Sequence, residues 1–195
     1  MAETEPPQIY LITPPEFELS VFPDTLARVL DHHPVACVRL ALASRDEDRI
    51  SRAADACREV THARDVALVI ESHLMLVERH GLDGVHLPDA GRSVRAARKE
   101  LGEDAIVGCF CGTSRHDGMN AGEAGADYIS FGPVDMDVFD WWSKVIELPV
   151  VAEGALDLAL VAKLAPMTDF LAFGEEIWRE EDPVQALGRF IAAIG

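Results

Sequence analysis

Several charged or polar side chains in this sequence stand where short apolar runs end, which is typical of residues that bind ligands or transfer protons. They are Glu71, His86, Asp89, Cys111, Asp135, Glu153 and Glu175. Glu71 and Glu153 each interrupt or directly end an apolar run, where a charge is costly unless it is solvated or paired. We therefore take Glu71, Glu153 and His86 as catalytic candidates, because carboxylates and an imidazole are the usual groups for proton transfer.

A hard divalent cation would suit the oxygen ligands in this set. Glu71, Asp89 and Asp135 are the metal candidates, since each carboxylate follows a strand-like run. Asp135 also stands near Asp137 and Asp140, and these three would serve equally well as a solvated loop. Both interpretations are kept at this point.

The four cysteines do not have the density of a disulfide framework, so reduced thiols are expected. Cys109 and Cys111 lie two residues apart, which places them on one face of a strand. Together with His86 they would suit a softer metal, although buried core thiols are the commoner use of such a pair.

The elements that must position these residues alternate regularly between short apolar runs and helical segments. Strands are predicted at 9–13, 35–42, 66–70, 83–87, 105–111, 128–131, 149–153 and 169–173. Helical segments follow these strands through to 183–194, which predicts a single (β/α)8 TIM barrel over residues 1–195, with 1–7 as a short acidic tail. A doubly wound open sheet is the alternative, but no glycine-rich dinucleotide fingerprint follows the first strand.

Two helix starts are predicted from capping residues. Asp24 is the expected N-cap of a helix through Asp31. Ser44 is the expected N-cap of the next helix, with Glu47 three residues later as the other half of a capping box.

In a barrel of this kind the carboxyl ends of the strands meet on one face. The candidate residues listed above would then share one mouth despite their distance in the sequence. We therefore expect a small-molecule ligand at that face.

The composition narrows the choice of partners. Acidic residues outnumber basic residues by 34 to 17, and a net charge of −17 disfavours nucleic acid. No apolar stretch reaches the roughly 18 residues that a membrane span needs, and the chain starts with the acidic segment MAETEPPQ. We expect a cytoplasmic protein without a membrane partner, and a homo-oligomer stays open.

Five sequence segments give the chain a family resemblance. They are YLIT at 10–13, DGVHLP at 83–88, GADYISFGPV at 125–134, PVVAEG at 149–154 and FLAFGEEIW at 170–178, the last followed by Glu-Asp-Pro. In their order and spacing these segments resemble the thiamine phosphate synthase and thiazole tautomerase family of small TIM barrels. The resemblance covers most of the chain.

The resemblance implies a function in thiamine biosynthesis. The family's synthase is a transferase that joins a hydroxymethylpyrimidine pyrophosphate to a thiazole phosphate, with Mg²⁺ as cofactor. Phosphate groups are bound by cations and by backbone N–H donors near the seventh and eighth strands. On this chain the resemblance implies ligand binding at Gly132, Gly154, Gly174 and Glu175.

The chain departs from the family pattern at positions that bind phosphate or metal. Arg39-Leu40-Ala41 stands where the family has a Gln-Leu-Arg motif followed by Lys, and Glu71-Ser72 stands where it has Asn-Asp. Asp135-Met136-Asp137 replaces a Thr-rich loop that ends in Lys. Glu153-Gly154 replaces Gly-Gly, and Glu175 replaces a Ser. A carboxylate about 4 Å from a phosphate oxygen costs on the order of several kcal/mol at intermediate dielectric. These departures predict that synthase activity is weak or lost.

The tautomerase branch of the family uses a histidine after the fifth strand. This chain has Gly112-Thr113 there, and His116 follows several residues later, so His116 does not match the family position.

Three functions therefore stay open. The first is a thiamine phosphate synthase-like enzyme with a diverged ligand site. The second is a diverged enzyme whose acidic mouth binds a metal or a cationic or neutral ring. The third is a non-catalytic ligand-binding barrel.

Overall fold

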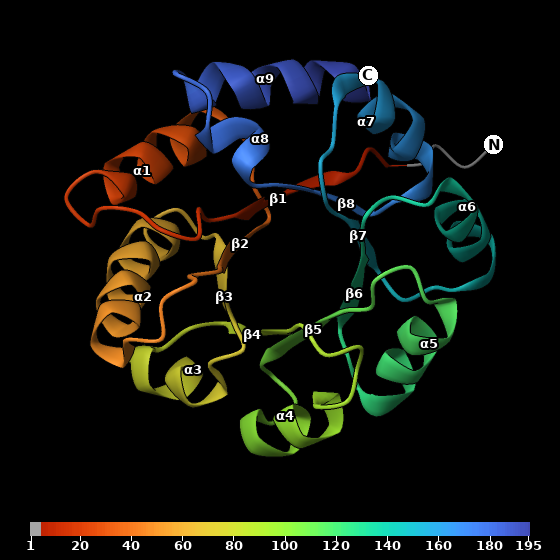
Figure 1. Cartoon of the computed structure of the whole chain (residues 1–195), viewed down its shortest axis with the longest axis horizontal. Coiled ribbons are helices and arrows are strands. Elements are labelled where there is room, and N and C mark those ends of the chain that lie inside the picture. Colours follow the sequence, from red (N-terminus) through yellow and green to blue (C-terminus); the bar gives the residue numbers. More distant parts are fainter. Residues whose placement is uncertain (1–4) are drawn as a thin grey trace.

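The computed structural model describes residues 5–195, and its eight parallel strands close into a barrel in sequence order. Closure is made by β1 pairing with both β2 and β8, with Leu11 beside Val38 on one side and beside Phe173 on the other. Figure 1 shows the strands at the centre and the helices in an outer ring. The prediction of a (β/α)8 TIM barrel is confirmed.

The elements follow one another with short connections. The strands are β1 (Gln8–Ile12), β2 (Cys37–Leu40), β3 (Ala67–Glu71), β4 (Gly84–Leu87), β5 (Ile106–Phe110), β6 (Tyr128–Phe131), β7 (Val150–Ala152) and β8 (Phe170–Phe173). The helices are α1 (Phe22–His32), α2 (Glu47–His62), α3 (Leu74–His80), α4 (Val94–Leu101), α5 (Arg115–Ala124), α6 (Met136–Val145), α7 (Leu158–Leu164), α8 (Glu175–Trp178) and α9 (Pro183–Ile194), with a 3₁₀ turn at Ala165–Met167.

The buried apolar side chains of the strands form two layers, one outside the barrel and one inside it. Successive side chains of a strand point to opposite faces, so one set packs against the helices and the other fills the barrel lumen. The outer layer includes Val38, Leu40 and Ile129. The buried apolar side chains of the lumen are Tyr10, Cys37, Val69, Tyr128, Val151 and Ala172. The strands therefore bury apolar side chains on both faces, as is typical of parallel strands that are covered on both sides.

The predicted start of the first helix is wrong. Helix α1 begins at Phe22 with Val21 as its N-cap, and Pro23 lies in its first turn. Proline suits the first turn of a helix because its missing N–H is not needed there. Asp24 is consequently inside the first turn, where its carboxylate interacts favourably with the positive end of the helix dipole.

The predicted capping box at Ser44 is also absent. Helix α2 begins at Glu47, and the side chain of Asp46 accepts hydrogen bonds from the backbone N–H groups of Asp48 and Arg49. Ser44 instead accepts a hydrogen bond from Asp46 N through its Oγ, at 3.1 Å. The cap therefore lies two residues later than the sequence pattern indicated.

Helix α8 is a short additional element that the sequence pattern did not predict. It begins directly after Gly174, and Figure 1 shows it inside the ring of helices, next to β1. Trp178 anchors it there, because its Nε1 donates to Ile12 O at 2.6 Å and its ring packs edge-on against Phe22.

Among residues 5–195, no helix combines the length and the apolar character that crossing a membrane requires.

Candidate ligand site at the carboxyl ends of the strands

A buried arginine stands at the centre of the barrel mouth. Arg39 follows Cys37 by two residues on β2, so its side chain also enters the lumen, and the residue is only 4% exposed. Its guanidinium makes a two-pronged ion pair with Glu153, with Nη1–Oε2 at 2.9 Å and Nη2–Oε1 at 3.3 Å. Its Nε lies 3.4 Å from Oε2 of Glu71. These carboxylates compensate a buried cation that would otherwise be very costly.

His86 connects this ion pair to the floor of the mouth. Arg39 Nη1 lies 2.7 Å from His86 Nε2, and because a guanidinium only donates, Nε2 must accept. The ring proton is then on Nδ1, which donates to the hydroxyl of Tyr128 at 2.9 Å. The hydroxyls of Tyr128 and Tyr10 are hydrogen-bonded to each other at 2.7 Å.

The environment of His86 keeps its ring neutral. Burial, with Arg39 as a smaller contribution, holds the pKa of His86 well below its ordinary value of 6.5. Both ring nitrogens are engaged in this arrangement, so His86 has no free lone pair for a ligand proton. The geometry makes it a residue that positions Arg39.

The tyrosine pair closes the floor beneath the ion pair. Burial raises the pKa of both Tyr10 and Tyr128 above the ordinary value of 10, so both hydroxyls stay protonated. Gly108 makes room for this arrangement, because a Cβ there would lie 2.0 Å from Cζ of Tyr128. A side chain on β5 at this position would displace the phenol from His86.

The three catalytic candidates thus lie around one cation. The Glu153 side chain is 14% exposed and the Glu71 side chain 35%, so Glu71 presents the more accessible carboxylate. Arg39, Tyr10 and Tyr128 were not predicted as site residues from the sequence. An arginine inside the apolar run VACVRLAL was the available signal, because a buried charge requires a partner.

The metal candidates do not assemble into one group. Asp135 is the N-cap of α6 and accepts from Asp137 N at 3.0 Å. Asp89 accepts a hydrogen bond from Ser93 through Oδ2, while its Oδ1 is buried without a partner. Across residues 5–195 no group of three or more His, Cys, Asp or Glu side chains is placed to hold a metal ion. Glu71 lies beside a guanidinium, which would repel Mg²⁺, so the residues of the mouth do not fit that cofactor.

The thiols lie away from the histidine that was considered as their metal partner. Cys109 and Cys111 have their sulfur atoms 3.9 Å apart and belong to the layer between barrel and helices. His86 points into the lumen, where it contacts Tyr128. The expected set for a soft metal is therefore not formed, because neighbouring strands direct these side chains to opposite faces of the sheet.

A pocket of about 600 Å³ opens beside the ion pair, at the carboxyl ends of β1, β2, β7 and β8. Its lining includes the predicted ligand-binding residues Gly154, Gly174 and Glu175, together with Glu153. Gly132 is not among the lining residues, and a Cβ there would come within 2.3 Å of the Glu153 carbonyl oxygen. Gly132 therefore serves the close packing of β6 against β7.

The lining of this pocket is strongly acidic. Four glutamates contribute to it, namely Glu153, Glu175, Glu176 and Glu180. Among the described lining residues Arg179 is the one cationic side chain, and it already pairs with Glu175 at 2.6 Å. Such a pocket favours a cationic or neutral ligand over an anionic one.

Unusual backbone conformations gather in the loops at this face. Ser72, Ala90 and Ala155 adopt left-handed φ angles of 70°, 57° and 50° in the loops after β3, β4 and β7. Residues with a side chain lose about 1–2 kcal/mol in this region. Strained backbone of this kind is concentrated at functional sites, in agreement with a ligand site at the carboxyl ends.

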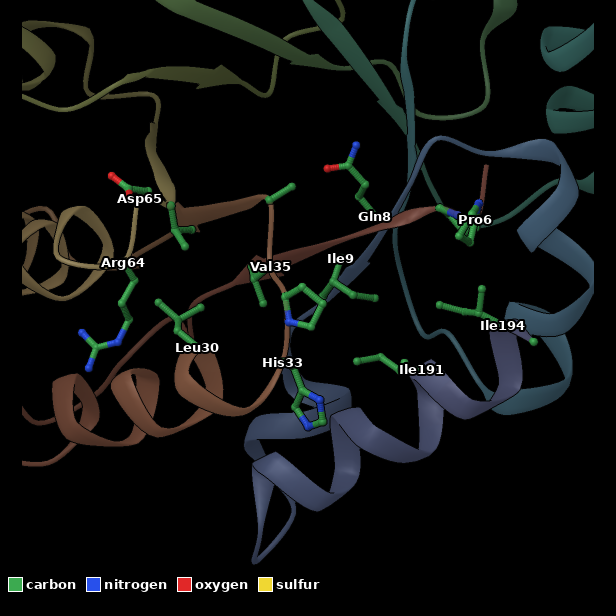
Figure 2. A pocket seen from close by; sticks show the side chains of 15 residues that line it. Pro6, Gln8, Ile9, Leu30, His33, Val35, Arg64, Asp65, Ile191 and Ile194 are labelled. Atoms are coloured by element: carbon green, nitrogen blue, oxygen red, sulfur yellow. The ribbon is translucent and has the colours of Figure 1, made fainter. Parts of the chain in front are cut away.

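The opposite face of the barrel has a second pocket, of about 610 Å³. Figure 2 shows Ile9, Leu30, Val35 and Ile191 around it. Two polar side chains at its edge are already paired: His33 Nε2 lies 2.8 Å from Val184 O, and Arg64 forms an ion pair with Asp31. It lies at the amino ends of the strands, the face that serves stability in TIM barrels.

Comparison with known proteins gives concordant results. Residues 9–174 match the family model described as thiamine monophosphate synthase. The thiamine-phosphate synthase of Rhodospirillum centenum is 38% identical, with 94% of this chain and 95% of the relative covered. That of Erythrobacter litoralis is 36% identical, with 99% and 100% covered. Among solved structures, thiamine phosphate pyrophosphorylase from Pyrococcus furiosus superposes with a TM-score of 0.84 at 17% identity, covering 96% of this chain and 95% of that one.

Proposed function

This chain belongs to the thiamine monophosphate synthase family, and we propose that it acts in thiamine biosynthesis by binding a ring compound of that pathway in the barrel mouth. The observation that carries the proposal is the ion pair of Arg39 with Glu153 beside an open pocket, at the face where TIM-barrel enzymes have their active sites. The proposed ligand is a small molecule at the C-terminal face, and the proposed location is the cytoplasm, as for a biosynthetic enzyme.

The barrel mouth is poorly suited to the synthase reaction for which the relatives are named. Coupling a pyrimidine pyrophosphate to a thiazole phosphate requires positive charge where the pyrophosphate is bound and expelled. Arg39 is buried and already neutralised by Glu153, and Glu71 approaches it from another side. The proposal therefore includes weak coupling activity, far below that of an active synthase.

The same groups are well suited to a nitrogen heterocycle. Ring N–H groups and exocyclic amines donate to carboxylates, and such charge-assisted hydrogen bonds are among the strongest in proteins. Glu71 has an exposed side-chain fraction of 35%, so it can accept such a bond while Arg39 holds it in place. Glu71 is thus the proposed ligand acceptor of the mouth.

A second candidate function follows from the same carboxylate. Glu71 stands 3.4 Å from the guanidinium of Arg39, which holds its carboxylate in position, and it remains accessible to solvent. A positioned and accessible carboxylate can take a proton from a bound ring and return it to another atom. Proton transfer on a bound heterocycle is therefore the alternative activity.

A combined binding and product assay tests the proposal. Thermal-shift titrations use the pyrimidine and thiazole compounds, and thiamine phosphate formation is followed beside a known active synthase. We expect a ligand-dependent rise in melting temperature, since binding to the native state stabilises it. The rise should be lost in Glu71→Gln and kept in Glu59→Gln, a matched change at an exposed position on α2.

The outcomes separate the alternatives clearly. Stabilisation without product at a rate comparable to the reference synthase supports the proposal. Product at a comparable rate would show that other groups replace the missing cations. A folded protein that no ring compound stabilises would refute ring binding.

A further inference from the structure

Three neighbouring parts of this barrel form the frame in which TIM barrels commonly bind phosphate. They are the loop after β7, the turn after β8, and a short extra helix that starts there. In this chain the third part is α8, and Gly174 is its N-cap. The backbone N–H groups that the frame offers include those of Leu156, after β7, and Gly174, after β8.

Both of these donors are already taken by a side chain of α8. Gly174 N donates to Oε2 of Glu176 at 2.7 Å, and Leu156 N donates to Oε1 of the same carboxylate at 3.2 Å. One carboxylate therefore bridges the two loops with its two oxygens. This is the arrangement that two oxygens of a bound phosphate would make.

A phosphate group would have to displace this carboxylate or lie against it. Displacement breaks two charge-assisted hydrogen bonds, which are about twice as strong as neutral ones. Close approach without displacement brings like charges together in a pocket that Glu153 and Glu175 also line. Either course disfavours a phosphorylated ligand here.

An uncharged polar group in the lumen still lacks a partner. Ser130 is fully buried, and its Oγ has no hydrogen-bond partner among the described residues. Ser130 pairs with Val151 of the lumen layer and follows Tyr128 by two residues, so its side chain also enters the lumen, nearer the mouth.

We infer that Glu176 takes the place of a ligand phosphate, and that the mouth accepts an unphosphorylated, neutral or cationic nitrogen heterocycle. This inference rests on the proposed function for the identity of the ring. It defines the substrate class more narrowly, because it excludes the phosphate ester form that the family's coupling reaction would use.

Two variants of Glu176 and one control test the inference. Glu176→Ala frees both backbone donors, and Glu176→Gln removes the charge while it keeps the size of the side chain if the alanine variant does not fold. Glu181→Gln is the control, because Glu181 is exposed, lies just beyond α8 and is outside the pocket lining. Calorimetric titrations use the thiazole alcohol, its phosphate monoester and inorganic phosphate.

The wild type should bind the alcohol at least about tenfold more tightly than the phosphate ester. In Glu176→Ala or Glu176→Gln this preference should fall by about tenfold or more, whereas Glu181→Gln should keep it. A wild type that prefers the ester, or Glu176 variants with an unchanged preference, would overturn the inference.

Inorganic phosphate separates this inference from the proposed function, since it needs no ring. If no ring compound binds, the proposed function fails. Phosphate binding that is gained only in the Glu176 variants would still support the role of Glu176, and the absence of that gain would refute it.

Discussion

Carboxylates at the two ends of the barrel have contrasting surroundings. At the amino ends, three aspartates directly precede β4, β6 and β8, and each accepts a backbone N–H of the preceding strand. These bonds join Leu68 N to Asp83, Val107 N to Asp127 and Val150 N to Asp169, at 2.7, 2.8 and 2.9 Å. At the carboxyl ends, Glu71 and Glu153 instead surround the side chain of Arg39.

The difference shows how position along a strand decides the role of an acidic residue. An aspartate at the amino end repeats one bond to the backbone of the preceding strand, and Asp83 and Asp127 add surface pairs with His62 and Arg98. A glutamate at the carboxyl end enters a mouth where side chains from several strands meet, so its partner comes from a distant part of the sequence. The first group stabilises the barrel, and the second forms the candidate ligand site.

The largest effect is expected from Arg39→Ala. The change removes the cation that pairs with Glu153, and it removes the N–H group that donates a hydrogen bond to His86 Nε2. Breaking a buried ion pair on one side typically costs about 3–5 kcal/mol. We expect a loss of this size in the free energy of unfolding, measured by urea denaturation.

The double variant Arg39→Met with Glu153→Met is the control for this prediction. It replaces both charges with apolar side chains, and such replacement is often far less harmful than breaking the pair. If the double variant were as unstable as Arg39→Ala, the loss of stability would come from lost packing. The carboxylates at the carboxyl ends would then differ less from the aspartates at the amino ends than we infer.

A smaller effect is expected in the pH dependence of stability. The pKa of His86 is depressed in the native state, so below pH 6.5 the unfolded chain binds a proton that the native protein excludes. Stability should therefore fall as the pH drops below that value. Between pH 7 and pH 5 this loss has an upper limit of about 2 kcal/mol, which holds for a ring that stays neutral throughout that range.

Replacing His86 by glutamine should remove that loss, as measured by urea denaturation at both pH values. His116→Gln changes an exposed histidine on α5 and should leave the pH dependence of the wild type in place. A curve for His86→Gln that parallels the wild type would contradict the assignment of His86 as a buried, neutral residue.

The fold was predictable because its signals are local and repeated. Apolar runs of strand length gave all eight strands, and several of these runs are closed by glycine or proline. Helix starts were less certain, since Asp24 and Asp46 are equally good capping residues and only Asp46 is an N-cap. The four-residue helix α8 is held by the tertiary contact of Trp178 with Ile12, which no local pattern encodes.

The site was predictable only in part. Glu71, His86 and Glu153 were recognised because they end strands, and strand ends converge in a barrel. Arg39 lies within the ladder of β2, and its partners are 47 and 114 residues away in the sequence, so only the closed barrel reveals them. The bridge made by Glu176 likewise depends on two loops that meet in space.

The most direct test of the central claim compares one carboxylate from each end of the barrel. Glu71→Ala and Asp169→Ala are measured for unfolding free energy and for the rise in melting temperature caused by the pyrimidine and thiazole compounds. Asp169→Ala should lose about 1–2 kcal/mol of stability, because it leaves Val150 N without its acceptor, and should keep the ligand effect. Glu71→Ala should lose less stability than Asp169→Ala, because Glu153 still pairs with Arg39, and should lose the ligand effect. A ligand effect that survives in Glu71→Ala but disappears in Asp169→Ala would contradict a ligand site at the carboxyl ends.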